Sequence, residues 1–396
     1  MPRTRNLRSP LRGTEFLCIL LGENVASNQR RSTRAALLAV VAAGALVVSA
    51  CGGTTTNPNA AVSSAPASPG VAATGGSSSG PAGTSVPASG KGSASAASSA
   101  ALTSGSAAST TAAAGGNGQP APLDLKLPAD PTLAASVPAK IKAAGQLIIA
   151  TDATYAPNEF LVNGAGSPVG MDVDLGTAIA QVLGLKVEFK KAGFDGILAG
   201  INAGRFDLSL SSFTDNVDRE KVVNFVNYFN AGTSTMVLAG NPLKINSDLD
   251  LCGKKVGAEN GTTQLSMLQK ADSDDSVVKV CTSAGKPAPT AQGYPTQTDV
   301  NGALLAGRID AYLADSPVVA YAVKQTGAKF QTVGKDIGVA PYGIAVPKEP
   351  AALTSAIQKA LQKLIDNGSY TKILTNWGVA SGGVKTATIN AAGSKK

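Results

Sequence analysis

Histidine does not occur anywhere in the 396 residues of the sequence. Its absence excludes Ser-His-Asp triads, imidazole acid–base chemistry and His-ligated metal sites. Cysteine is scarce as well, with four residues and no CxxC spacing, so neither a dithiol redox site nor a tetrahedral zinc site is expected. The sequence therefore predicts no catalytic residues, no metal and no cofactor.

An excess of basic over acidic residues is nearly lacking over most of the chain and is concentrated at its start. Residues 1–122 hold 8 of the 34 Lys and Arg residues but only 2 of the 26 Asp and Glu residues. The net charge of +8 thus belongs mainly to the N-terminal part, and residues 123–396 are nearly neutral. A nucleic-acid-binding domain needs clustered cations on the domain itself, so nucleic acid is not an expected partner.

A run of small and apolar residues, 35–48, follows Arg30, Arg31 and Arg34. It is too short to cross ~30 Å of hydrocarbon, which takes about 20 residues, so residues 1–50 are predicted to be a cleaved signal peptide. The sequence VSAC at 48–51 resembles a bacterial lipobox, which predicts that Cys51 is lipidated and anchors the chain to the outer face of the cell membrane. The alternative is a plain secretory signal. Residues 1–24 have no apparent role, and a start at Val25 would give a signal of conventional length.

Residues 51–122 consist mainly of Ser, Ala, Gly, Thr and Pro, with a single Lys and no aromatic residue. Such a segment cannot bury enough apolar surface to offset the entropy lost on ordering. We expect a disordered tether of ~70 residues with a reach of about 45 Å by random-coil scaling. A glycosylated stalk of the same composition is an open alternative.

The rest of the chain alternates between the patterns of strands and helices. Strands are predicted at 146–150, 186–189 and 206–210, helices at 171–183 and 194–203, and further strands begin near 255 and 311. A long helix over 351–366 and a second helical segment over 370–377 complete the pattern. Alternation of this kind indicates an α/β fold, in which ligands bind at the C-terminal ends of the strands.

Several blocks in this region carry a family resemblance. They are TDATYAP (151–157), GMDVDL (170–175), GFDGILAGINAGRFDLSLSSFTDNVDREKVVNF (193–225), GKKVGAENGTTQ (253–264), LLAGRIDAYLAD (304–315) and NGSYTKILTNWG (367–378). Together they resemble the periplasmic polar-amino-acid-binding proteins, family three of the bacterial solute-binding proteins, over about residues 140–380. The resemblance implies a two-lobed periplasmic-binding-protein-like fold of type II with two crossing hinge strands. Lobe 1 would comprise 140–234 and 341–382, lobe 2 would comprise 235–340, and 383–396 would be a flexible tail.

The resemblance also implies a function. The chain would capture a polar amino acid in the cleft between the lobes and deliver it, as a monomer, to the membrane permease of an ABC importer. Two alternatives are an exported enzyme of the cyclohexadienyl dehydratase type on the same fold, and a ligand-sensing receptor subunit. The identity of the bound amino acid stays open. The candidates are amino acids with a cationic side chain, amino acids with an amide side chain, and glutamate.

Two charged residues match the family's anchors for the amino-acid zwitterion. Arg219 stands where the family's arginine binds the carboxylate, and its planar fork suits bidentate contact. Asp315 matches the carboxylate that binds the ammonium group, although a helix N-cap before Ser316 and Pro317 would also explain it. Removing a zwitterion from water requires partners for both charges.

The remaining candidate ligand-binding residues are polar or aromatic. By resemblance, the hydroxyl groups of Ser211, Ser212 and Thr214 assist Arg219, and the aromatic rings of Tyr155 and Phe194 enclose the ligand side chain. Thr262 and Thr263 begin a helix beside the ligand, and the carboxylate of Asp152 meets the polar end of the ligand side chain. Turn capping and ordinary core packing are the alternative explanations. One position departs from the family, since many relatives have an aromatic residue where this chain has Asn158.

Two cysteines fall in the predicted second lobe. Cys252 and Cys281 are the only cysteines of the folded region, and the chain is predicted to be exported. Disulfides persist in such compartments, so we expect these two residues to be bonded, with two buried free thiols as the alternative.

Overall fold

The computed structural model describes residues 119–392. The predicted signal peptide, the lipidation site at Cys51 and all but the last residues of the predicted tether lie outside this range. None of the helices between residues 119 and 392 is both long enough and apolar enough to span a bilayer.

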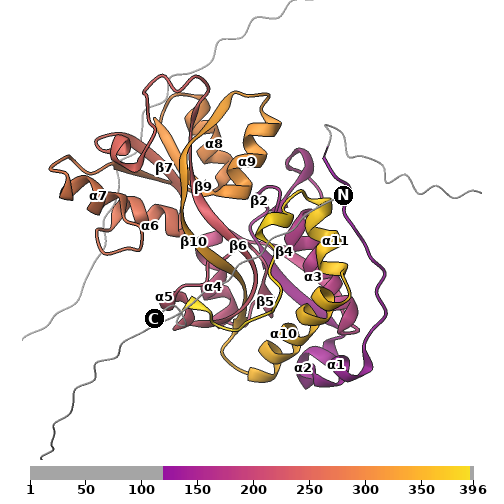
Figure 1. The fold of residues 1–396 in the computed structure, drawn as a ribbon. Helices are drawn as coiled ribbons and strands as arrows, with labels where there is room; N and C mark the ends of the chain where they lie inside the picture. Colours follow the sequence, from indigo (N-terminus) through magenta and orange to yellow (C-terminus); the bar gives the residue numbers. More distant parts are fainter. Residues whose placement is uncertain (1–118, 393–396) are drawn as a thin grey trace, which may run out of the picture. The chain divides into compact units, whose positions relative to one another are not determined.

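The described residues form an eight-stranded mixed sheet in the order β4-β1-β5-β10-β6-β9-β7-β8, and a small sheet of β2 and β3. The strands are β1 (Gln146–Thr151), β2 (Thr154–Tyr155), β3 (Glu159–Phe160), β4 (Lys186–Lys191), β5 (Leu208–Ser209), β6 (Val223–Leu238), β7 (Lys255–Glu259), β8 (Thr290–Tyr294), β9 (Ala311–Asp315) and β10 (Phe330–Pro347). The parallel pairings β4-β1-β5 and β9-β7-β8 lie at opposite ends of the sheet. Each of these two sets of parallel strands forms the central sheet of one α/β lobe, as Figure 1 shows.

The two lobes are joined by β6 and β10, which pair antiparallel along most of their length. Near one end β10 pairs with β5 of lobe 1, and toward the other end β6 pairs with β9 of lobe 2. The pairing is irregular between Val333 and Gly343, where the strands pass from one lobe to the other. The predicted lobe boundaries at 234–235 and 340–341 fall inside these two strands. A pair of continuous strands with local bulges is a suitable hinge, because small backbone rotations there move whole lobes.

Helices cover both faces of the sheet in each lobe. They are α1 (Pro131–Ser136), α2 (Ala139–Ala144), α3 (Met171–Val182), α4 (Phe194–Asn202), α5 (Val217–Glu220), α6 (Thr263–Gln269), α7 (Val277–Ser283), α8 (Gln297–Leu305), α9 (Ser316–Gln325), α10 (Ala351–Asp366) and α11 (Ser369–Asn376). In lobe 1, α3, α10 and α11 enclose the larger core, and α4 covers a second one on the other face. Two further cores lie in lobe 2. β1 and β5 of lobe 1 are therefore buried between layers, which explains the run of apolar residues in β1, whereas β4 at the edge of the sheet is more exposed.

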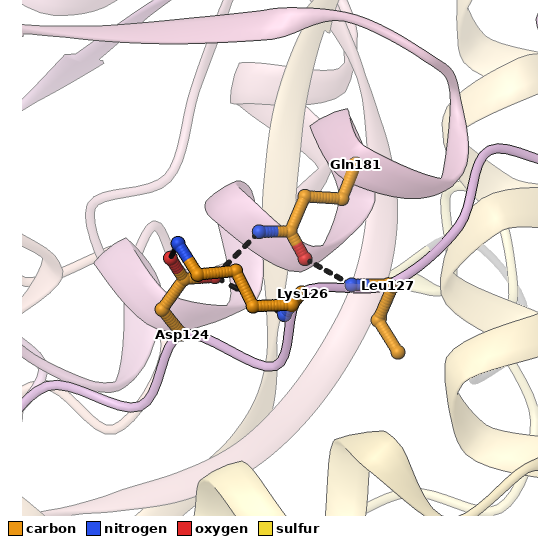
Figure 2. A network of polar contacts seen from close by, with 4 residues as sticks. All are labelled: Asp124, Lys126, Leu127 and Gln181. Atoms are coloured by element: carbon orange, nitrogen blue, oxygen red, sulfur yellow. Dashed lines mark hydrogen bonds and ion pairs between the residues drawn. The ribbon is translucent and has the colours of Figure 1, made fainter.

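A segment before the first helix is fixed on lobe 1. Leu123, Leu125 and Leu127 pack against its core. Figure 2 shows the polar contacts beside them, in which Gln181 of α3 accepts a hydrogen bond from the Leu127 amide (2.9 Å) and donates one to Asp124 (2.6 Å). Asp124 also forms an ion pair with Lys126. The folded domain therefore includes the residues that directly follow the predicted tether.

The predicted flexible tail is wrong for residues 383–391. Backbone bridges join Gly383 to Phe229 and Ile389 to Val226 of β6. The amide of Asn227 donates to the carbonyl of Thr388 at 2.8 Å. This part of β6 belongs to lobe 1, whereas β9 pairs only with residues 233–236, so the strand has a free edge that the tail covers.

The expected disulfide joins Cys252 to Cys281. Cys281 lies on α7 and is fully buried in a core of lobe 2, and Cys252 packs at its margin. The bond closes a loop with a sequence separation of 29 residues, within lobe 2. It therefore stabilises that lobe without restricting the hinge.

Candidate functional site

A cavity lies between the lobes, at the C-terminal ends of strands from both. Its lining is polar, with one guanidinium, four carboxyl groups and several hydroxyls. The lining residues are Asp152, Tyr155, Glu159, Phe194, Ser212, Thr214, Arg219, Glu259, Thr262, Thr263, Gln264 and Asp315. Because carboxyl groups outnumber the single guanidinium, the electrostatic field in the cavity favours positive charge.

Arg219 lies on the short helix α5 and reaches across to lobe 2. Its Nη1 donates to the carbonyl of Thr214 at 2.8 Å and its Nη2 to the carbonyl of Gly261 at 2.9 Å. The guanidinium lies over the ring of Phe213, 5.1 Å from its centroid. Burial lowers the pKa of Arg219 to about 10, so the group is charged at neutral pH. The remaining N–H groups of the fork are oriented by these contacts and can bind an anion.

Asp315 ends β9 and is 6% exposed. It occupies the N-cap position of α9, yet its side chain makes no capping hydrogen bond. Its carboxylate instead accepts hydrogen bonds from the hydroxyl of Tyr155 (2.9 Å) and from Nε2 of Gln264 (2.8 Å). Burial raises the pKa of Asp315 to about 6, against these hydrogen bonds and the charge of Arg219. The helix-cap explanation is therefore wrong, and Asp315 presents its carboxylate to the cavity.

The phenol of Tyr155 connects the two lobes. Besides donating to the carboxylate of Asp315, its oxygen accepts a hydrogen bond from the Asp315 amide at 3.0 Å. The hydroxyls of Thr214 and Thr263 approach across the cleft at 3.5 Å. Gly261 of lobe 2, which has a φ of +77°, also lies close to lobe 1, because a Cβ atom there would lie 2.9 Å from Cα of Asp195. The lobes are thus in contact around the cavity, and only glycine permits this approach.

Two acidic side chains from opposite lobes meet in the cavity. Asp152 follows β1 of lobe 1, and Glu259 ends β7 of lobe 2. Burial is the main cause that raises the pKa of both, and each carboxyl group is among the groups that act on the other. Burial, together with the negative charge of Asp152, Asp195 and Asp315 around it, raises the pKa of Glu259 to about 10.

A second acidic pair lies at the floor of lobe 1. Glu159 accepts hydrogen bonds from the hydroxyls of Ser211 and Ser212, both at 3.2 Å. Asp172 accepts from the amide of Ser212 (3.0 Å) and from the hydroxyl of Tyr228 (2.8 Å). Burial raises the pKa of Glu159 well above its ordinary range and that of Asp172 to about 6. The pair therefore retains a proton at neutral pH and contributes less negative charge than two free carboxylates.

The other predicted residues divide into those that face the cavity and those that support it. Phe194 begins α4 and stacks on Phe213 with a centroid distance of 4.2 Å. Thr262 caps α6, with its hydroxyl accepting from the amide of Leu265, so capping accounts for this residue. Ser211 is fully buried behind the lining, where its hydroxyl accepts a hydrogen bond from the Asp152 amide at 2.8 Å.

The structure brings nine of the ten predicted ligand-binding residues to the cavity lining, and Ser211 alone stands behind it. Sequence reasoning missed Glu159, Glu259 and Gln264. Gln264 directly follows the two predicted threonines, and Glu259 ends a predicted strand, so position at a strand or helix end was the available signal. The departure at Asn158 is also explained, because this residue is fully buried outside the lining and donates to the hydroxyl of Ser212 at 3.0 Å.

Across residues 119–392, the His, Cys, Asp and Glu side chains do not gather in any group of three or more that could hold a metal ion.

Comparison with known proteins identifies related chains. Residues 147–380 match the profile of "Bacterial extracellular solute-binding proteins, family 3". Arginine-binding protein ArgT of Corynebacterium glutamicum is 32% identical over 262 residues, which are 66% of this chain and 83% of ArgT. A solved structure, an ancestral arginine-binding protein bound to arginine, is 37% identical with a TM-score of 0.52, over 59% of this chain and 98% of that one. The ancestral amino-acid-binding protein AncCDT-1, a precursor of cyclohexadienyl dehydratase, is 30% identical with a TM-score of 0.51, over 60% of this chain and 97% of that one.

Proposed function

Because the chain belongs to the bacterial extracellular solute-binding proteins, family 3, we propose that it captures an amino acid with a cationic side chain, such as arginine. It does so outside the cytoplasm, as a monomer, and delivers the ligand to the membrane permease of an ABC importer. The names of similar proteins support this proposal, since both ArgT and the ancestral protein are described as arginine-binding.

The charge of the cavity carries the proposal for the ligand class. Arg219 is placed to bind the ligand's carboxylate, and Asp315 its ammonium group. Asp152 and Glu259 are then left facing the ligand side chain, both buried, at 3% and 2% exposure. Two carboxyl groups that meet in a buried site are stabilised by a cation. A guanidinium or ammonium group on the side chain meets this requirement, whereas a carboxylate would add to the repulsion.

A panel of calorimetric titrations at pH 7.5 tests the ligand class. We expect arginine, lysine or ornithine to bind at least about tenfold more tightly than glutamine, and glutamate more weakly still, because a tenfold difference needs only about 1.4 kcal/mol. Tighter binding of glutamate or leucine than of every cationic amino acid would contradict the proposal.

We propose capture and not catalysis, because the similar dehydratase precursor is itself named as an amino-acid-binding protein. Turnover of prephenate or arogenate by the purified chain would contradict this.

We further propose that the mature chain is anchored by a lipid on Cys51, which precedes the tether and lies outside the described residues. The support is the lipobox-like sequence after the apolar run. Replacing Cys51 by Ala should leave the chain uncleaved or release it from the membrane. Recovery of a processed, membrane-bound chain from the Cys51→Ala strain would exclude this anchor.

A further inference from the structure

The two acidic side chains on either side of the cleft differ in their hydrogen bonds. Asp152 accepts from the amide and hydroxyl of Thr154 (3.1 and 2.6 Å) and from the amide of Phe194 (3.1 Å). Glu259 has a fully buried Oε1 for which the described residues supply no N–H or O–H donor. Asp152 is therefore held as an acceptor, and Glu259 has an unmet need for a proton or a cation.

No Lys or Arg side chain of the described residues meets that need. Within residues 119–392, neither carboxyl group forms an ion pair with a Lys or Arg side chain. The guanidinium of Arg219 is directed to the carbonyls of Thr214 and Gly261. The titratable groups that act on the pair from neighbouring elements are carboxyl or phenol groups. They are Glu159 of β3, Asp195 of α4, Asp315 of β9 and Tyr155 of β2.

The position of the pair makes its charge depend on closure. Asp152 belongs to lobe 1 and Glu259 to lobe 2, so opening the hinge separates them and exposes both to water. Solvated carboxyl groups ionise near pH 4. Closure brings the two negative charges together in a buried site, where like charges within a few ångströms disfavour full ionisation. A closed cleft with both groups ionised is therefore unfavourable unless one positive charge enters with the ligand.

We propose that Asp152 and Glu259 make closure of the cleft conditional on one positive charge between them, supplied by a cationic ligand side chain or by a proton. The inference rests on the proposed function and deepens it. Arginine carries the charge itself, so its binding requires no net proton uptake. A neutral amino acid closes the cleft only if one proton is taken from solvent and bound at Glu259.

Arginine and citrulline provide the test, because they have nearly the same shape and differ in the charge of the side-chain end group. Each is titrated calorimetrically into the mature chain between pH 5.5 and pH 8, in buffers with different ionisation enthalpies. Linkage predicts that uptake of one proton makes the citrulline Kd rise up to about tenfold per pH unit. We expect such a rise with about one proton taken up, and less than about a threefold change for arginine.

Glu259→Gln separates this mechanism from a general effect of pH. The amide permanently replaces the protonated acid, so citrulline binding should become independent of pH without proton uptake, and arginine binding should weaken at least about tenfold. Asp195→Asn is the matched control, since it removes a nearby charge outside the cavity lining. It should retain proton uptake with citrulline.

The outcomes distinguish the two proposals. Citrulline binding that is flat with pH in the unsubstituted chain, or absent at pH 5.5 when arginine binds, overturns the charge requirement. Equal proton uptake with arginine and citrulline overturns it as well. If no cationic amino acid binds and glutamine does, the proposed ligand class fails, and proton uptake on glutamine binding still decides the charge requirement.

Discussion

Replacing Arg219 by Ala is expected to weaken arginine binding by about 2–5 kcal/mol, which corresponds to a Kd higher by a factor of about thirty to several thousand. In the Ala variant, the ligand's carboxylate would enter a cavity whose remaining ionisable groups, among them Asp152, Glu259 and Asp315, are acidic. Loss of the guanidinium also removes the contact with the carbonyl of Gly261, which joins the lobes. Both effects act against the closed, ligand-bound state.

Calorimetric titration with arginine at pH 7.5 measures this loss. Arg219→Lys should fall between the parent and the Ala variant, because it retains the charge without the planar fork. Arg205→Ala is the matched control, since Arg205 is exposed and lies over Phe206, away from the cavity. An Arg219→Ala variant that folds and binds arginine as the parent does would show that the carboxylate is bound elsewhere.

Replacing Asp315 by Asn should cost about as much, 2–5 kcal/mol, because the ammonium group of the ligand loses its anionic partner in a buried site. Asn retains the size of Asp and one acceptor oxygen for Tyr155 or Gln264. The change therefore tests charge with little change in packing. The loss should apply to every amino acid with a free ammonium group, whereas changes at Glu259 should depend on the side chain.

The exposed residue Asp272 gives the control, and Asp272→Asn should bind arginine as the parent does. Unchanged affinity in Asp315→Asn would mean that the ammonium group lies at another carboxylate, and the zwitterion would then not be shared between the lobes.

The sequence predicted the local elements of the fold well, for a physical reason. The predicted strand at 146–150 and helix at 351–366 correspond to β1 and α10, because β1 is a short run of apolar residues and α10 has apolar residues at helical spacing. The long strands β6 and β10 were not predicted as such. Their residues pass between two lobes with different neighbours, so no single periodic pattern extends along them.

Two contacts between distant segments were not predicted from the sequence. The docking of residues 123–127 on α3 and of residues 383–391 on β6 depends on strand edges and grooves that exist only after folding. Glu259 was missed for the same reason. A glutamate that ends a strand is ordinary in sequence, and its meaning comes from Asp152, which lies more than a hundred residues away in the other lobe.

The central claim is that one amino acid is held by both lobes and closes the hinge. The distance between the lobes tests it, using fluorescent labels on Lys186→Cys of β4 and Lys279→Cys of α7, both exposed positions, in the mature chain with Cys51 replaced by Ser. The native pair Cys252 and Cys281 is bonded and does not react with the labels. We predict that arginine shortens the distance between the labels in the parent and has no such effect in Asp315→Asn. An unchanged distance in the parent at a saturating arginine concentration would contradict the claim.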